Sequence, residues 1–163
     1  MRAIRLTQWG QPPELVDVPV PDPRGEELLL RVDAAGLCGS DLHLADASTD
    51  AFTFDVPFTL GHEVVGTVVA AGPEADAAWM DAPVVVHGLW SCGTCRSCVR
   101  GRENYCFAFR RQDGRGARIG AGIGRDGGLA DYMVVPSTRV LVRADGVDPR
   151  TAAPLADAGL TAY

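Results

Sequence analysis

Hydrophobic and polar residues alternate over several short stretches of this chain, the pattern of β-strands with one buried face. Within residues 27–35, for example, Leu28, Leu30 and Val32 fall on one face. Residues 61–72 are instead rich in β-branched side chains throughout, which predicts burial on both faces. The complete set of predicted strands is 3–6, 15–18, 27–35, 61–72, 84–86, 130–135 and 140–142.

Helix signals are few. Ser40 or Asp41 can cap one short helix, and Asp148 followed by Pro149 opens another, because proline suits the first helical position. Glycine and proline punctuate most of the remaining chain. Many short strands with such punctuation predict a mainly β (α+β) fold in the form of an irregular barrel.

Length and composition are those of one globular domain, with 163 residues of which 47% are hydrophobic. The formal net charge is −6 and lysine is absent, so we expect no partner that needs a clustered positive surface, neither nucleic acid nor a membrane. The first ten residues lack the apolar core of a signal peptide, and no apolar run has the length of a membrane span. These features predict a cytoplasmic protein with reduced cysteines.

Four of the five cysteines follow a C-x2-C-x2-C-x7-C pattern. A tetrahedral zinc site needs four soft donors at about 2.3 Å, and tight turns can deliver them at this spacing. Disulfides and iron–sulfur ligation are alternatives, although disulfides are typical of small secreted domains. Four thiolates leave zinc no open position, so this metal would be structural. The four residues are Cys92, Cys95, Cys98 and Cys106.

Two other residues are candidates for chemistry, Cys38 and His62. Taken alone, a histidine of this kind is more often a core residue than a ligand, and a lone cysteine is more often a small buried hydrophobe. Their neighbours change this interpretation. Glu63 follows His62 directly, and three polar residues follow Cys38 closely, namely Ser40, Asp41 and His43.

Together with the cysteine pattern, residues 38–43, 57–66, 128–136 and 152–163 resemble the zinc-dependent medium-chain alcohol dehydrogenases, in the same order along the chain. The resemblance implies a GroES-like domain with a protruding zinc lobe at about 88–110. It also implies reversible oxidation of an alcohol to an aldehyde or ketone, with hydride transfer to NAD or NADP. The partner would be a small alcohol, aldehyde or ketone, and the enzyme could be a homo-oligomer.

The resemblance further implies a catalytic zinc on Cys38, His62 and Asp157, which makes two zinc ions per chain. Three protein ligands leave the fourth position open for water or substrate, and a thiolate with a carboxylate offsets the 2+ charge. Zinc lowers the pKa of a bound hydroxyl, so that an alkoxide can form and expel a hydride. If Asp157 were remote, Glu63 would be the next candidate ligand.

Supporting roles follow from the same resemblance. Ser40 would take the alcohol proton, and His43 would pass it to solvent through the cofactor ribose. Asp41 would hold the far nitrogen of His62, and Glu63 would lie behind the metal as an electrostatic tuner or a transient ligand.

The chain offers few residues for a cofactor beyond His43. Thr161 matches a family position that contacts the nicotinamide. Residues 122–127 match G-x-G-x-x-G, but they precede a strand instead of opening a helix, so we interpret them as a flexible loop. The cofactor-binding Rossmann domain of the family is expected to lie outside residues 1–163. This chain alone is therefore expected to be inactive and to bind no NAD(P).

Other expectations concern the pocket and the turns. Residues 52–54 and 87–90 would line a pocket for a hydrophobic substrate of modest size. Met80 stands where the family usually has a glycine, which leaves the geometry of that turn open. Residues 155–163 should expose apolar surface. The alternative to a dehydrogenase is a stand-alone zinc-binding GroES-like module without catalysis.

Overall fold

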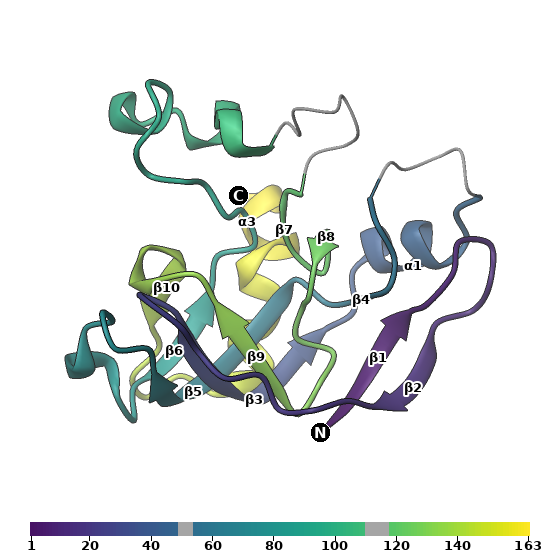
Figure 1. Ribbon diagram of the computed structural model, residues 1–163, viewed down its shortest axis with the longest axis horizontal. Coiled ribbons are helices and arrows are strands. Elements are labelled where there is room, and N and C mark those ends of the chain that lie inside the picture. Colours follow the sequence, from purple (N-terminus) through teal and green to yellow (C-terminus); the bar gives the residue numbers. More distant parts are fainter. Residues whose placement is uncertain (49–53, 110–117) are drawn as a thin grey trace.

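The computed structural model describes residues 1–48, 54–109 and 118–163 (Figure 1). Its described strands are β1 (Arg2–Leu6), β2 (Glu14–Asp17), β3 (Leu28–Gly36), β4 (Phe58–Thr59), β5 (Glu63–Ala71), β6 (Pro83–Val86), β7 (Gly120–Ala121), β8 (Gly124–Arg125), β9 (Tyr132–Val135) and β10 (Leu141–Arg143). The described α-helices are α1 (Gly39–Ala45), α2 (Pro149–Ala152) and α3 (Ala158–Ala162). All seven predicted strands are present, with ends that differ by at most two residues.

The strands form three sheets in the described part of the chain. The largest is antiparallel, in the order β10-β6-β5-β3-β9, and the others have the orders β2-β1-β4 and β7-β8. An isolated bridge between Ala3 and Ala130 connects β1 to the segment that leads into β9. The predicted mainly β fold is confirmed, but the described strands do not close into one barrel.

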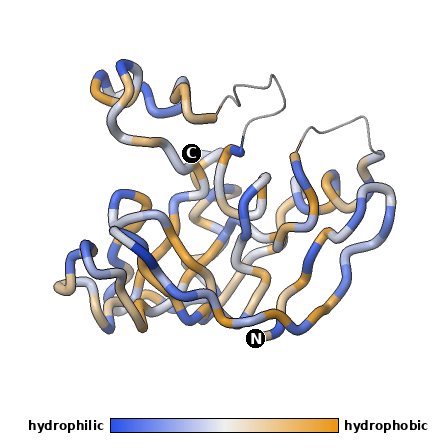
Figure 2. The backbone as a smooth tube through the Cα atoms, in the orientation of Figure 1, coloured by the Kyte–Doolittle hydropathy of each residue, from blue (hydrophilic) through white to orange (hydrophobic). Residues whose placement is uncertain are grey.

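Hydrophobic side chains of the large sheet form the main core. Figure 2 shows hydrophobic residues concentrated along its central strands. The predicted inner face of β3 is confirmed for Leu28 and Leu30, which are fully buried, whereas Val32 is half-buried. A second cluster lies between β1, α1 and β4 and includes Leu6, Leu44 and Phe58. These two cores hold the ends of β3 and β5, where the chain turns toward the candidate site.

Helix α1 begins differently from the prediction. Its N-cap is Cys38, in an extended conformation, and neither Ser40 nor Asp41 holds that position. Asp41 lies in the first turn instead, where its Oδ2 accepts a hydrogen bond of 3.0 Å from the Cys38 amide. The Asp41 side chain thus satisfies the backbone N–H of the N-cap residue, as the third helical residue does in a capping box. For α2 the prediction is confirmed, since Asp148 is the N-cap.

Two turns answer questions that the sequence left open. Met80 has a φ of −57°, and the left-handed conformation falls on Asp81 at 60°. No helix follows the glycines of 122–127, which confirms that they are not a dinucleotide-binding motif. That segment is anchored to β4 and its neighbours, because the Gly127 amide donates to the Thr59 carbonyl at 2.8 Å. The segment is also not a loop throughout, because β8 (Gly124–Arg125) lies within it.

Beyond β6 the chain leaves the sheet as a lobe of short 3₁₀ turns, which Figure 1 shows projecting above the strands. Near residue 163, Leu155 and Leu160 are each 59% exposed, which confirms the expected apolar surface. None of the described helices has the length and apolar character needed to cross a bilayer.

Candidate metal centres

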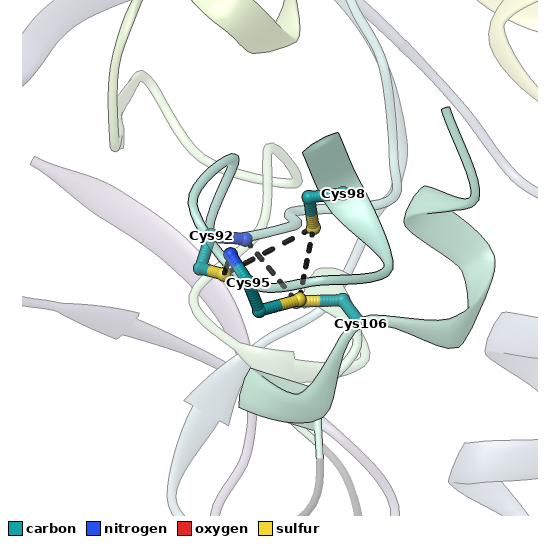
Figure 3. A group of neighbouring side chains, drawn as sticks. All are labelled: Cys92, Cys95, Cys98 and Cys106. Carbon is teal, nitrogen blue, oxygen red and sulfur yellow. Dashed lines mark hydrogen bonds between the residues drawn. The ribbon is translucent and has the colours of Figure 1, made fainter. Parts of the chain in front are cut away.

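The four cysteines of the lobe converge on one point, as Figure 3 shows. Cys92 and Cys95 lie in the first turn, Cys98 begins a 3₁₀ turn, and Cys106 follows another. Their sulfurs lie within 4.8 Å of one another. All four are free thiols, so the structure excludes the disulfide alternative.

Sulfur separations in the lobe match a tetrahedral metal site. Cys98 Sγ lies 3.5 Å from Cys95 Sγ and 3.9 Å from Cys92 Sγ. A tetrahedron with metal–sulfur bonds of about 2.3 Å has edges of about 3.8 Å, whereas a disulfide would bring sulfurs to about 2.05 Å. The thiols are therefore spaced for one ion at their centre.

The ionisation of these thiols differs around the cluster. Backbone amides of Thr94 and Cys95 lower the pKa of Cys92 to about 6. Burial and the neighbouring thiols Cys95 and Cys106 raise the pKa of Cys98 to about 11. In the metal-free lobe, Cys92 is thus the ready thiolate, and a metal must displace the Cys98 proton.

A second group of metal-ligand type is formed by Cys38, His62 and Asp157. Each residue immediately precedes an element: Cys38 precedes α1, His62 precedes β5 and Asp157 precedes α3. Asp157 Oδ2 lies 3.6 Å from Cys38 Sγ and 3.3 Å from His62 Nε2. Three segments far apart in the sequence thus present a thiol, an imidazole and a carboxylate to one point. Asp157 is near the other two, so Glu63 is not needed as the third ligand.

His62 provides the evidence that a cation fits here. It is only 2% exposed, and its Nδ1 and Nε2 lie 3.5 Å from Asp41 and 3.3 Å from Asp157, yet neither nitrogen makes a well-aligned hydrogen bond in the described part of the chain. A buried polar atom without a partner is costly, and a metal on Nε2 would satisfy it. The thiol, imidazole and carboxylate donors also suit zinc.

Asp41 organises the cluster from behind. Its Oδ1 accepts a hydrogen bond from the Gly61 amide at 3.1 Å and lies 3.5 Å from His62 Nδ1. Burial alone would raise the pKa of Asp41, but contacts with His62, Cys38 and Gly61 outweigh it and hold that pKa low. The resulting carboxylate raises the pKa of His62 to about 9. One side chain therefore holds the backbone of both Cys38 and Gly61 and orients the imidazole.

Gly61 makes this arrangement possible. Its φ of +93° is in the left-handed region, and a Cβ there would lie 2.7 Å from the backbone of Leu129. Only glycine can adopt this turn while pointing its amide at Asp41. The sequence carried a signal for this role, since Gly61 directly precedes the candidate ligand His62.

Glu63 connects β5 to the segment that carries Asp157. It is 2% exposed, and its Oε1 accepts a hydrogen bond of 2.9 Å from the Ala158 amide. Its other oxygen, Oε2, lies against Gly36, where a Cβ would come within 2.1 Å of it. Gly36 and Glu63 are direct partners in the β3–β5 register. The space that Gly36 leaves is therefore what allows Glu63 to hold the start of α3.

We expect Gly36→Ala to weaken zinc binding at the three-residue cluster by about tenfold or more, because residues behind metal ligands commonly contribute factors of this size. The added methyl group would displace Glu63 and release the Ala158 amide. Chelator competition would measure affinity, and hydrogen exchange would measure protection of that amide.

Gly39→Ala is the matched control, since a Cβ there would meet nothing within 4 Å. Glu63→Gln keeps an acceptor oxygen and should retain most of the amide protection. Wild-type zinc affinity in Gly36→Ala, with the Ala158 amide still protected, would contradict this role.

The remaining predicted residues lie at the margin of the cluster. Ser40 is half-buried, with its Oγ 3.9 Å from Cys38 Sγ. His43 is exposed in the last turn of α1. Thr161 is also exposed, and its amide donates to the Asp157 carbonyl at 2.8 Å, so it shares a helix with that ligand.

The predicted pocket residues are placed only in part. Residues 52 and 53 lie outside the described residues, and Phe54 packs edge-on against Phe58. Gly88 lies against the backbone of His62, whereas Trp90 is buried in the core of the large sheet. Of this set, Gly88 is the residue that directly adjoins a candidate ligand.

These features define a class of protein: a GroES-like domain with a four-cysteine lobe and a separate three-ligand cluster. Residues 24–145 match the alcohol dehydrogenase GroES-like domain family, and the chain belongs to that family.

Among curated proteins, D-arabinose 1-dehydrogenase (NADP(+)) of Saccharolobus solfataricus is 38% identical over 98% of the chain and 43% of its own length. L-threonine 3-dehydrogenase of Saccharopolyspora erythraea is 36% identical, with 94% and 42% covered. Both are named as dehydrogenases. The chain thus spans less than half the length of these relatives.

Solved structures agree. The alcohol dehydrogenase of the archaeon Aeropyrum pernix superimposes with a TM-score of 0.83 at 31% identity, covering 100% of the chain and 46% of that protein. Acetophenone reductase of Geotrichum candidum, in complex with NAD, gives 0.82 at 33% identity, covering 98% and 45%. These likenesses confirm the GroES-like fold.

Proposed function

We propose that this chain supplies the zinc-holding catalytic part of an NAD(P)-dependent alcohol dehydrogenase. Such an enzyme interconverts a small alcohol with its aldehyde or ketone. The relatives support this proposal, since one is named for NADP(+) and a structural neighbour was solved with NAD. Residues 1–163 would contribute the metal sites and one side of the substrate pocket.

Each of the two metal clusters has its own role in this proposal. Cys92, Cys95, Cys98 and Cys106 would hold a structural zinc. Cys38, His62 and Asp157 would hold the catalytic zinc, which when bound would act as a Lewis acid on the oxygen of the alcohol or carbonyl group. Three protein ligands suit that task because a fourth position stays available.

The chain's own residues would manage the proton and the geometry. Ser40, half-buried beside Cys38, would accept the alcohol proton, and the exposed His43 would pass a proton to solvent. Asp41 would fix the imidazole of His62 so that Nε2 faces the cluster. Glu63 would hold the Asp157 segment in place through the Ala158 amide.

The observation that carries this proposal is the convergence of Cys38, His62 and Asp157, whose candidate ligand atoms lie within 4.8 Å of one another. A stand-alone zinc module would require only the lobe. The second cluster offers three candidate ligands, Cys38, His62 and Asp157, and three ligands are typical of a catalytic zinc, which favours an enzyme.

Metal analysis tests the proposal directly. We expect the purified chain to hold two zinc ions, and Cys38→Ala to hold about one, because the thiolate is a principal donor of the cluster. Ser40→Ala is the control, since it removes a neighbouring hydroxyl but no ligand. With cobalt in place of zinc, the visible spectrum should respond to a small alcohol in wild type and not in Cys38→Ala. A single zinc ion in wild type, or a spectrum indifferent to alcohol, would contradict a catalytic site.

A further inference from the structure

A cavity lined by both arginines and aspartates lies between the segment before β4 and strand β8, outside both metal clusters. Its volume is about 280 Å³, and Asp55, Arg118, Arg125 and Asp126 supply its charged lining. Neither the structural zinc nor the catalytic cluster uses these residues.

Arg125 is the unusual member of the cavity. It is half-buried at the end of β8, and its Nε is fully buried without an acceptor among the described residues. The guanidinium carbon lies 6.0 Å from the centre of the Trp90 ring, an arrangement that holds the cation in one orientation. Burial and the charge of Arg118 lower the pKa of Arg125. The guanidinium is thus oriented but not neutralised by the described chain.

Both carboxylates of the cavity are engaged by other arginines. Asp55 Oδ2 lies 3.1 Å from Arg118, and Asp126 Oδ1 lies 3.2 Å from Arg5. Asp126 Oδ1 also accepts a hydrogen bond of 2.7 Å from the Thr59 amide. Among the described residues, three guanidinium groups therefore face two carboxylates, and Arg125 carries the surplus positive charge.

We propose that Arg118 and Arg125 form a binding site for a small oxyanion group, a phosphate or carboxylate, between β8 and the segment before β4. Arginine presents paired N–H donors that match such oxygens in a two-pronged contact, and a partly desolvated guanidinium gains most from it. The anion is either a free ion or an acidic group on a larger molecule, and its chemistry at the site is the same in both cases.

Stacking on Trp90 accounts for the orientation of Arg125 but leaves its buried Nε without an acceptor. That nitrogen is shielded from solvent, so an oxyanion would be held by the part of the guanidinium that lines the cavity, where no described carboxylate pairs with Arg125. Stacking on Trp90 does not by itself require burial of the guanidinium, because an arginine with solvated nitrogens can stack equally well.

The zinc-loaded chain, titrated with inorganic phosphate at constant ionic strength in chloride, provides the test. The Trp90 indole N–H, which donates to the His87 carbonyl at 3.1 Å, is a reporter in nitrogen-15 NMR spectra. We expect a saturable shift of this signal and of an arginine Nε signal. In Arg125→Gln the affinity should fall by about tenfold, the size of one strong charge-assisted contact.

Arg150→Gln is the matched control, because it removes one positive charge from an exposed position on α2 and should leave binding unchanged. Arg118→Gln supplies a second variant if Arg125→Gln loses its fold. Acetate and methyl phosphate separate the sources. Equal binding of methyl phosphate and inorganic phosphate would indicate a group carried on a larger molecule, and exclusive binding of the inorganic ion would indicate a free anion. A response that does not saturate, or equal affinity in the Arg125 and Arg150 variants, would overturn the proposal.

Discussion

Replacing Cys98 by serine is expected to remove the metal of the lobe and the order of residues 92–106, while leaving the large sheet folded. Cys98 is 5% exposed, and its sulfur lies 3.9 Å from that of Cys92 and 3.5 Å from that of Cys95. The described lobe consists of 3₁₀ turns without strand pairing among its cysteines, so the proposed metal would be what closes it. Hydrogen exchange with metal analysis should show one zinc lost per chain and rapid exchange confined to the lobe.

Val99→Ser is the control for this substitution. Val99 follows Cys98 in the same 3₁₀ turn but is 72% exposed, so serine there should change neither metal content nor exchange. If Cys98→Ser kept two zinc ions, or if strands β3 and β5 lost protection together with the lobe, the proposed separation of lobe and sheet would be wrong.

Zinc affinity at the cluster of Cys38, His62 and Asp157 is expected to fall at least about tenfold for each pH unit below pH 9. The contact with Asp41 raises the pKa of His62 to about 9, so the metal-free imidazole is protonated at neutral pH. Zinc needs the neutral ring and must displace that proton. Zinc titrations between pH 6 and pH 9 should show this slope, with Cys38→Ala reporting the lobe alone.

The same protonation affects the stability of the metal-free chain with the opposite sign. Because the folded pKa of His62 lies above its unfolded value, its contribution is complete below pH 6.5 and is lost as pH rises through about 9. Asp41→Asn should lower the pKa of His62 and move both effects to lower pH. A zinc affinity that does not change between pH 7 and pH 9 would contradict the raised pKa.

Strand positions could be predicted well from the sequence because they depend on local alternation and on glycine and proline turns. The lobe could also be predicted, since its four ligands lie within one short segment. Cys38 and His62 gave weaker signals alone, and the family resemblance was needed to add Asp157. Residues that are close to the cluster in the fold but whose role depends on strand pairing or backbone conformation, such as Gly36, could not be identified from the local sequence pattern.

The contacts that sequence reasoning missed depend on register and on backbone geometry. That Gly36 faces Glu63 follows from the β3–β5 pairing, which includes two register shifts that no alternation pattern encodes. Asp41 was predicted to orient His62, but its hydrogen bonds to two backbone amides require the turn at Gly61. In the turn near Met80, the residue with a positive φ is Asp81 and not Met80, because an aspartate tolerates that conformation better than a methionine.

The two metal clusters differ greatly in how far apart their ligands lie along the chain. Cys92 and Cys106 are 14 residues apart, whereas Cys38 and Asp157 are separated by 119. During synthesis the lobe can therefore capture zinc as soon as residue 106 leaves the ribosome. The second cluster stays one ligand short until residue 157 emerges and α3 docks beside β5. If both clusters bind zinc as proposed, the lobe would be able to take up its metal during synthesis before the three-ligand cluster is complete.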